Sequence, residues 1–387
     1  MSAASGWAQA RRILCVRLDT IGDVLMTTPA IRALKEALPG RHVTLLTSSA
    51  GAAVVPFVPE VDDVIVYDAP WMKATTARTD SRSEYAMADR LRRGGFEAAA
   101  IFTVYSQNSL PSTFLCHLAD IPLRLAHCRE NPYQLLSHWV PECEPEPLLR
   151  HEVRRQLDLV ATVGCHTANE RLSFHVTDEA LQSVLHLLYQ IGLDQEKGWA
   201  VLHPGASAAS RRYAPEQFAE VARLLTEKAG LEIVFTGAET ERSLVEQIRR
   251  RAGIRSWSLA GRLDLGELGA VLALTPLLIS NNTGPVHIAA AVGTPVVDLY
   301  ALTNPQHTPW NVPCRVLFHD VPCKYCYKSV CPQGHHHCLS LITPESVVSA
   351  ALELLEETST QRWRAAGVIP AAQTAEASLA AHHATQA

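Results

Sequence analysis

The sequence lacks the features that mark several protein classes. Charged residues are only 19% of its 387 residues, against roughly a quarter in an average soluble chain. Hydrophobic residues reach 47%, and this balance excludes disorder over most of the length. No stretch reaches the ~18 uninterrupted apolar residues of a membrane-spanning helix. The first dozen residues contain no apolar core of the kind that a secretory signal requires.

A basic excess is also missing. The formal net charge is −5, which argues against a general nucleic-acid binder, because such proteins carry surplus positive charge. The length exceeds what one compact core usually holds and fits two domains of ordinary size. We therefore expect a soluble, cytoplasmic, two-domain protein that binds no nucleic acid.

Short apolar runs alternate with helical patterns along the chain, which is typical of parallel-sheet α/β domains. The pattern predicts strands at 13–16, 43–46, 64–67, 98–102, 199–203, 233–235, 277–279 and 296–299, and helices at 23–38, 178–191, 215–228, 288–292 and 345–357. We expect two doubly wound domains, at 12–175 and 197–343. A C-terminal helix at 344–358 and a disordered, Ala-rich tail at 359–387 complete the predicted organisation.

Five of the ten cysteines lie close together near the C-terminus. They are Cys314, Cys323, Cys326, Cys331 and Cys338, and three histidines at 335–337 lie among them. Thiolates and imidazoles at these spacings suit tetrahedral zinc, but the pattern is not two clean CxxC pairs. A structural zinc and a reduced, tightly turned loop both remain open, and we predict neither a metal site nor a cofactor.

The first candidate site joins the first predicted strand to its helix. The segment from Arg17 to Asp23 is not the glycine-rich GxGxxG turn of dinucleotide-binding domains. Gly22 permits a close backbone approach, and Asp23 lies where a helix begins. Asp23 is either a helix cap or a functional carboxylate, and the neighbouring Asp19 gives this junction a second acid.

The second candidate site follows the strand at 277–279. There Asn282 is a suitable helix N-cap, Thr283 offers a hydroxyl and Gly284 removes side-chain bulk. Free N–H groups and the helix dipole form an anion site that suits a diphosphate. His287, one turn further on, is either a buried structural histidine or a hydrogen-bond donor to a phosphate oxygen, and we favour the phosphate interpretation.

Four segments together resemble family 9 glycosyltransferases, the ADP-heptose:lipopolysaccharide heptosyltransferases. They are RILCVRLDTIGDVLMTTPAIRALKEALPG, HPGASAASRRYAPEQFAEVARLL, FTGAETER and SNNTGPVHIAAAVGTPVVDLY. They follow the order and spacing of the family and span residues 12–358. The resemblance implies a GT-B architecture, in which two Rossmann-like domains face a central cleft and the C-terminal domain binds the donor.

The resemblance also implies an inverting, metal-independent transfer of heptose from ADP-heptose to a lipopolysaccharide core acceptor. Asp23 matches the family's general base. Residues that match donor contacts are Arg211, Glu241, Asn282, Thr283, Gly284 and His287. Glu239 is a close competitor of Glu241 for the ribose contact.

Three departures from the family pattern concern the donor side. Asn282 stands where the family often has Asp, Arg211 stands for a lysine, and Tyr213 with Ala214 replaces Trp-Pro. The Asn282 departure weakens the identification of the donor and prompts the hypothesis of a non-catalytic protein that binds a nucleotide sugar. Two more hypotheses are a transferase for another nucleotide sugar or glycan acceptor, and a sugar-nucleotide epimerase, for which the sequence offers no additional acid/base set.

The segment from Lys73 to Arg93 has a surplus of basic residues. It matches a basic loop that the resemblance places near anionic acceptor sugars, although a solvated helix face explains such a run about as well. With a lipid-linked acceptor, we also expect peripheral contact with the cytoplasmic face of the inner membrane.

Overall fold

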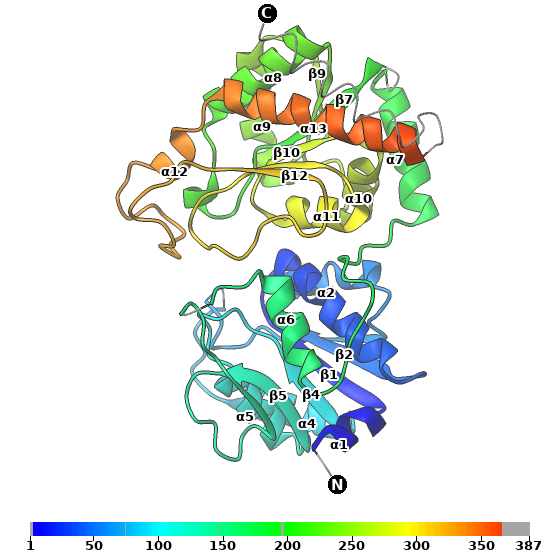
Figure 1. The fold of residues 1–387 in the computed structure, drawn as a ribbon, viewed down its shortest axis with the longest axis vertical. Helices are drawn as coiled ribbons and strands as arrows, with labels where there is room; N and C mark the ends of the chain where they lie inside the picture. Colours follow the sequence, from blue (N-terminus) through cyan, green and yellow to red (C-terminus); the bar gives the residue numbers. More distant parts are fainter. Residues whose placement is uncertain (1–2, 74, 147, 195–196, 366–387) are drawn as a thin grey trace, which may run out of the picture.

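The computed structural model describes residues 3–73, 75–146, 148–194 and 197–365, and it has two halves, each built on a parallel sheet (Figure 1). The strands of the N-terminal sheet are β1 (Arg12–Arg17), β2 (His42–Thr47), β3 (Asp63–Val66), β4 (Ala98–Ile101), β5 (Leu123–Cys128) and β6 (His138–Pro141). Those of the C-terminal sheet are β7 (Trp199–His203), β8 (Glu232–Phe235), β9 (Ser256–Ser258), β10 (Leu278–Asn281), β11 (Val296–Leu299) and β12 (Cys314–Leu317).

Helices cover these sheets. In the N-terminal half they are α1 (Ala3–Gln9), α2 (Ile21–Glu36), α3 (Ser49–Ala52), α4 (Arg82–Arg93), α5 (Leu110–Leu118) and α6 (Glu152–Ala161). In the C-terminal half they are α7 (Asp178–Gln190), α8 (Pro215–Ala229), α9 (Arg242–Ala252), α10 (Leu265–Leu274), α11 (Gly284–Val292), α12 (His337–Ser340) and α13 (Pro344–Ala365).

Both sheets have the same strand order. The N-terminal order is β3-β2-β1-β4-β5-β6 and the C-terminal order is β12-β11-β10-β7-β8-β9, with every neighbouring pair parallel. The N-terminal order is the Rossmann order 3-2-1-4-5-6, and the C-terminal sheet likewise reverses direction between two central strands. The predicted α/β class with two doubly wound sheets is therefore confirmed. Ligands of such sheets bind beyond the strand carboxyl ends where the order reverses, here at β1/β4 and β7/β10.

Some predicted boundaries differ from the structure. The helix predicted at 23–38 begins at Ile21, because Thr20 precedes its first turn and Asp23 lies inside that turn, where its carboxylate accepts hydrogen bonds from Thr20. The C-terminal helix continues to Ala365, so the first seven residues of the predicted disordered tail (359–365) are helical. The remainder of that tail, 366–387, lies outside the described residues.

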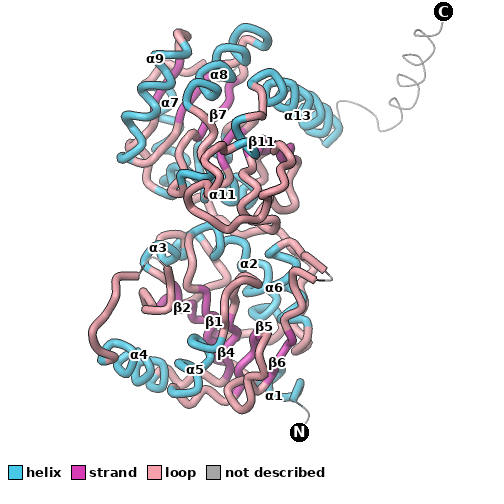
Figure 2. The backbone as a smooth tube through the Cα atoms, turned by 90° about the vertical axis from the view of Figure 1, so that its left-hand side faces the viewer, coloured by secondary structure: helices cyan, strands magenta, loops and turns pink. Residues whose placement is uncertain are grey.

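The two halves meet along α2 and α11 (Figure 2). One apolar cluster contains Val24 and Leu25 of α2 as well as Val286 and Ile288 of α11. Gly22 allows the close approach, because a Cβ atom there would lie 2.7 Å from Cδ2 of His287. The helices that follow β1 and β10 therefore bring the two candidate sites to one boundary.

Among the described residues, no helix has both the length and the apolar character needed to cross a membrane.

Candidate active site

The N-terminal half of the site is a buried charge cluster around Arg17, the last residue of β1. Its guanidinium is completely buried and contacts three carboxylates, with Nε 2.9 Å from Asp19, Nη2 3.1 Å from Asp23 and Nη1 2.6 Å from Glu152. Glu152 lies at the start of α6 and is also fully buried. If a carboxylate moved away from Arg17, its buried negative charge would lose its compensating partner. Arg17 therefore holds each of the three carboxylates in a fixed position.

The two aspartates of this cluster differ in their affinity for protons. Burial disfavours the charged form of Asp23, but Arg17 and hydrogen bonds from Thr20 outweigh it and hold its pKa at about 2. Burial outweighs the attraction of Arg17 for Asp19, and the charge of Asp23 adds to the effect, so its pKa rises to about 6. Asp23 is thus a permanent carboxylate at neutral pH, whereas Asp19 titrates near neutrality.

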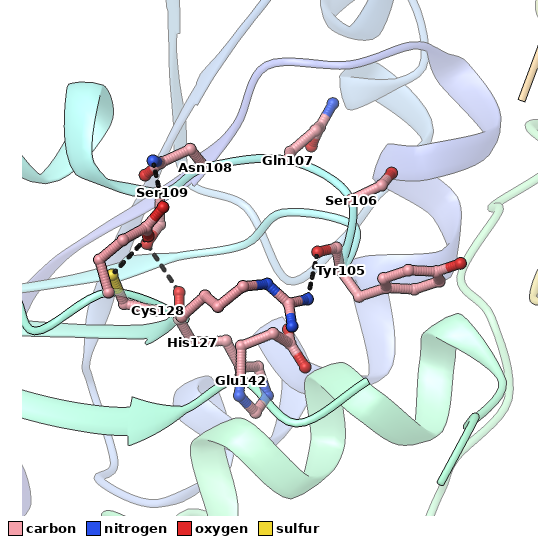
Figure 3. Close-up of a pocket in the computed structure, with 10 residues that line it drawn as sticks. Tyr105, Ser106, Gln107, Asn108, Ser109, His127, Cys128 and Glu142 are labelled. Carbon is pink, nitrogen blue, oxygen red and sulfur yellow. Dashed lines mark hydrogen bonds between the residues drawn. The ribbon is translucent and has the colours of Figure 1, made fainter. Parts of the chain in front are cut away.

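A cavity of about 180 Å³ opens beside this cluster, at the carboxyl ends of β4, β5 and β6 (Figure 3). Residues 105–109, 127–130 and Glu142 line it. Gln107 connects the cavity to the cluster, since its Nε2 donates to Asp19 at 2.6 Å. His127 is buried with its Nδ1 unpaired within the described chain, and burial lowers its pKa to about 4. The cavity is polar and adjoins the acids at the end of β1.

The C-terminal half of the site is the turn between β10 and α11. Thr283 is the residue before the first turn of α11. The prediction that Asn282 is the N-cap is therefore wrong, because its side chain bonds in the opposite direction, into the sheet.

Thr283 Oγ1 and His287 Nδ1 are buried atoms without a partner among the described residues. In the first turn of α11, Pro285 has no N–H and the Val286 N–H donates to the Thr283 carbonyl at 3.0 Å. The N–H of Gly284, Thr283 Oγ1 and His287 Nδ1 therefore form a set of hydrogen-bonding groups without partners among the described residues.

His287 lies at the boundary with the N-terminal half, against Gly22. The side chain is 4% exposed, and burial together with the positive potential of neighbouring groups lowers its pKa to about 3. A neutral imidazole carries one ring N–H. His287 can therefore donate a hydrogen bond to a phosphate oxygen without carrying a positive charge.

Asn282 connects two buried elements. Its Nδ2 donates to Oδ2 of Asp298 at 2.9 Å and to the carbonyl oxygen of His307 at 2.8 Å. Asp298 is the third residue of β11 and is fully buried, which raises its pKa to about 8. The sequence interpretation overlooked Asp298, although a lone acid inside the apolar run Val296–Leu299 is the signal that would have identified it.

Arg211 and Glu241 lie at the carboxyl ends of β7 and β8. Arg211 ends the short helix η3 (Ala209–Arg211), is partly exposed, and makes no side-chain hydrogen bond or ion pair with the described residues. Glu241 faces the loop after β7, because a Cβ atom on Gly205 would overlap its carboxylate. Glu239 is instead 67% exposed and paired with Arg242 at 2.7 Å. Of the two acids, Glu241 is therefore the one that faces the loop after β7.

The cysteine-rich segment, residues 319–338, spans both halves of the site. Its Ser329 carbonyl accepts from the backbone N–H of Ser210 at 3.0 Å, next to Arg211. Ser329 Oγ also accepts from Lys73 at 3.1 Å, and Tyr327 is hydrogen-bonded to Tyr105. The sequence analysis considered only metal binding by this segment. The tyrosines next to its cysteines, among them Tyr327, are the feature that could have indicated a contact with the other half.

A second loop of the C-terminal half, residues 304–308, rests on α6. Gln306 Nε2 donates to Glu144 at 3.0 Å, its carbonyl accepts from the Glu152 N–H at 3.1 Å, and His151 bonds the Thr308 carbonyl at 2.9 Å. His307 lies between the halves, close enough to interact electrostatically with Asp23 and with Arg211. No motif in the sequence indicated this loop.

Two further predictions concern the cysteines and the basic run. Within the described part of the chain, no three His, Cys, Asp or Glu side chains are grouped so that they could hold a metal ion.

In the basic run from Lys73 to Arg93, three arginines are paired with carboxylates, which reduces the positive potential of the run. They are Arg78, Arg82 and Arg92. Arg90 and Arg93 are exposed on α4.

Two Rossmann-type sheets with charged and polar groups at facing strand ends are the architecture of GT-B proteins. The model of glycosyltransferase family 9 (heptosyltransferase) matches residues 85–337. The chain therefore belongs to glycosyltransferase family 9, as its sequence motifs predicted.

Similar proteins agree with this assignment. The chain is 23% identical over 342 residues to a lipooligosaccharide heptosyltransferase 2 of Campylobacter jejuni, covering 87% of this chain and 96% of that protein. A solved family 9 glycosyltransferase from Veillonella parvula has a TM-score of 0.73 at 23% identity and covers 90% and 97% of the two chains. The ADP-heptose lps heptosyltransferase II of Escherichia coli has a TM-score of 0.68 at 21% identity, with coverage of 90% and 99%. These structural likenesses confirm the fold.

Proposed function

We propose that this protein transfers heptose from ADP-heptose to a lipopolysaccharide core acceptor, by a single displacement that inverts the anomeric centre. The names of its relatives support this donor and acceptor. The observation that carries the proposal is the meeting of Asp23 with the N-terminal end of α11 across the contact between Gly22 and His287. A nucleophile and a diphosphate leaving group need this arrangement of facing sites.

In the proposed step, Asp23 is the general base on the acceptor side. An acceptor hydroxyl gives its proton to the Asp23 carboxylate as its oxygen attacks the anomeric carbon. The bond between that carbon and the ADP oxygen breaks, and ADP leaves with the electron pair. Arg17 holds the Asp23 carboxylate in position at 3.1 Å.

Asp19 is the competing base of the same cluster. With a pKa near 6 it is a better proton acceptor than Asp23, although it is also ion-paired with Arg17. We assign the role to Asp23 because it adjoins Gly22, the residue that packs against His287. The kinetics of Asp19→Asn beside Asp23→Asn separate the two.

We assign diphosphate binding to groups that the protein leaves unpaired within its described residues. The Gly284 N–H at the start of α11, Thr283 Oγ1 and His287 would bind the diphosphate. Glu241, whose carboxylate also accepts from the Ala238 N–H at 2.8 Å, would bind the ribose. Arg211 would neutralise the charge that builds on departing ADP. Because these groups supply positive potential at the leaving group, we propose a transfer that needs no metal ion.

The test measures release of nucleoside diphosphate from ADP-heptose, ADP-glucose, UDP-glucose and GDP-mannose, each with and without truncated lipopolysaccharide. We expect ADP release from ADP-heptose only when the acceptor is present. Release from another donor would keep the mechanism and replace the substrate. Tight ADP-sugar binding without transfer, unchanged in Asp23→Ala, would favour a non-catalytic binding protein.

We further propose that the reaction takes place at the cytoplasmic face of the inner membrane, since the acceptor is lipid-linked. The exposed basic side chains of α4, Arg90 and Arg93, would attract anionic lipid headgroups. Flotation with anionic and with neutral vesicles tests this, and equal recovery with both would contradict an electrostatic contact.

A further inference from the structure

Position 282 is the one diphosphate-site position where the chain departs from its family pattern by loss of a charge. Its structural surroundings explain the change. Two acceptor oxygens face the Asn282 side chain from one direction, Oδ2 of Asp298 on β11 and the carbonyl oxygen of His307. Only an NH₂ group satisfies two acceptors, so the orientation of the amide is fixed by chemistry.

This orientation leaves the Asn282 Oδ1 on the opposite side of the amide. The atom makes no hydrogen bond with any residue that the structure describes, and Asn282 retains 5% of its surface. Asn282 directly precedes Thr283 and Gly284, at the start of α11. An acceptor oxygen without a partner among the described residues therefore belongs to the residue next to the groups assigned to the donor.

A carboxylate at position 282 would be poorly satisfied in the same surroundings. The oxygen that replaces Nδ2 would face both the Asp298 carboxyl and the His307 carbonyl, and at most one proton, on Asp298, would serve these acceptors. Both side chains are 95% buried or more, so water cannot supply the missing donors. The carboxyl group that position 282 lacks is instead present one strand away, at position 298.

We infer that Asn282 and Asp298 form a coupled amide–carboxyl pair, in which Asp298 is a positioning residue that aims the Asn282 oxygen at a hydrogen-bond donor of the bound nucleotide sugar. The inference rests on the proposed donor site. In this interpretation, Asp298 compensates for the asparagine at position 282. The absence of an aspartate at 282 is then no argument for a non-catalytic protein.

The experiment compares wild type with Asn282→Asp, Asp298→Asn and the double exchange Asn282→Asp/Asp298→Asn in the full chain. Readouts are the KM for ADP-heptose, kcat, and calorimetric binding of ADP-heptose. Asn282→Asp should raise KM and weaken binding by about tenfold or more, the size of a lost buried hydrogen bond. The double exchange should recover part of both losses, because the new amide at position 298 then donates to the new carboxylate at position 282, while the His307 carbonyl still lacks its donor.

Asn169→Asp makes the same chemical change at a position outside the site and should leave all readouts unchanged. A double variant no better than the worse single variant would overturn the inference, as would an Asn282→Asp protein with normal KM. If Asn282→Asp does not fold, recovery of folding and of donor binding in the double exchange still supports the pair.

Failure of the proposed function is recognised separately. Wild type that neither binds nor turns over ADP-heptose contradicts the donor assignment and with it the positioning role. In that case the urea unfolding of the four proteins still reports whether positions 282 and 298 are coupled.

Discussion

The two halves of the site are built on similar doubly wound sheets but differ in how their charged groups are paired. At the end of β1, Arg17 pairs with three carboxylates in a buried cluster. At the end of β10, Thr283 and His287 keep unpaired buried atoms, and Arg211 makes no side-chain hydrogen bond or ion pair within the described chain. Each charged group of the first arrangement therefore has an opposite charge beside it, although Glu152 Oε2 and His127 Nδ1 there also lack hydrogen bonds, whereas Arg211 of the second has no counter-ion within the described chain. On the proposed function, this difference means that the acceptor side holds a base in position, while the donor side offers a cation and hydrogen-bonding groups to a ligand.

The largest expected effect is from removing Arg17, the centre of the buried charge cluster. Arg17→Met should destabilise the protein by about 3–5 kcal/mol, because it leaves buried carboxylates uncompensated. Arg211→Met, which removes a partly exposed cation without an ion pair among the described residues, should change stability by less than about 0.5 kcal/mol. Urea denaturation measures both. Similar losses in the two variants would mean that the halves do not differ in this way.

Three glycines provide a sharper comparison of the halves. Gly22→Ala places a Cβ atom 2.7 Å from the His287 ring, and Gly205→Ala places one against the Glu241 carboxylate. Each should lower kcat/KM by about tenfold or more, since a misplaced group at a reacting site is costly. Gly284→Ala meets only Ile21 at 3.9 Å, so its stability should be normal and any kinetic loss would report the ligand. Normal kinetics in Gly22→Ala would contradict the contact at the boundary.

The pH dependence of turnover distinguishes Asp23 from Asp19 as the general base. A base with the pKa of Asp23, about 2, stays ionised throughout pH 5–8, so kcat should not fall toward pH 5 on its account. A base with the pKa of Asp19, about 6, would be protonated on acidification, and kcat would fall about tenfold per pH unit below 6. Measuring kcat from pH 5 to 8, with unfolding followed at each pH, decides between them.

The sequence was sufficient to predict the class, the alternation of strands and helices, and the two strand–helix junctions at the sheet switch points. Those features depend on local pattern and on parallel-sheet topology. It was insufficient for Arg17, Glu152, Asp298 and the loop 304–308, whose roles come from contacts between residues far apart in the chain. Asn282 shows why, because its bonding is set by Asp298 and His307, which approach it only in the folded structure. The extension of α13 to Ala365 was missed because polar residues there weaken the helical pattern.

The central claim is that the N-terminal half of the site, with Asp23, activates the acceptor, and that the C-terminal half, with His287, binds the donor. One crossed measurement tests it most directly, the kcat and ADP affinity of Asp23→Asn and His287→Ala side by side. We predict that Asp23→Asn loses about 10²-fold or more in kcat with nearly unchanged ADP affinity. His287→Ala should instead lose mainly ADP and ADP-heptose affinity. Near-normal turnover in Asp23→Asn, or unchanged ADP affinity in His287→Ala, would contradict this division of roles.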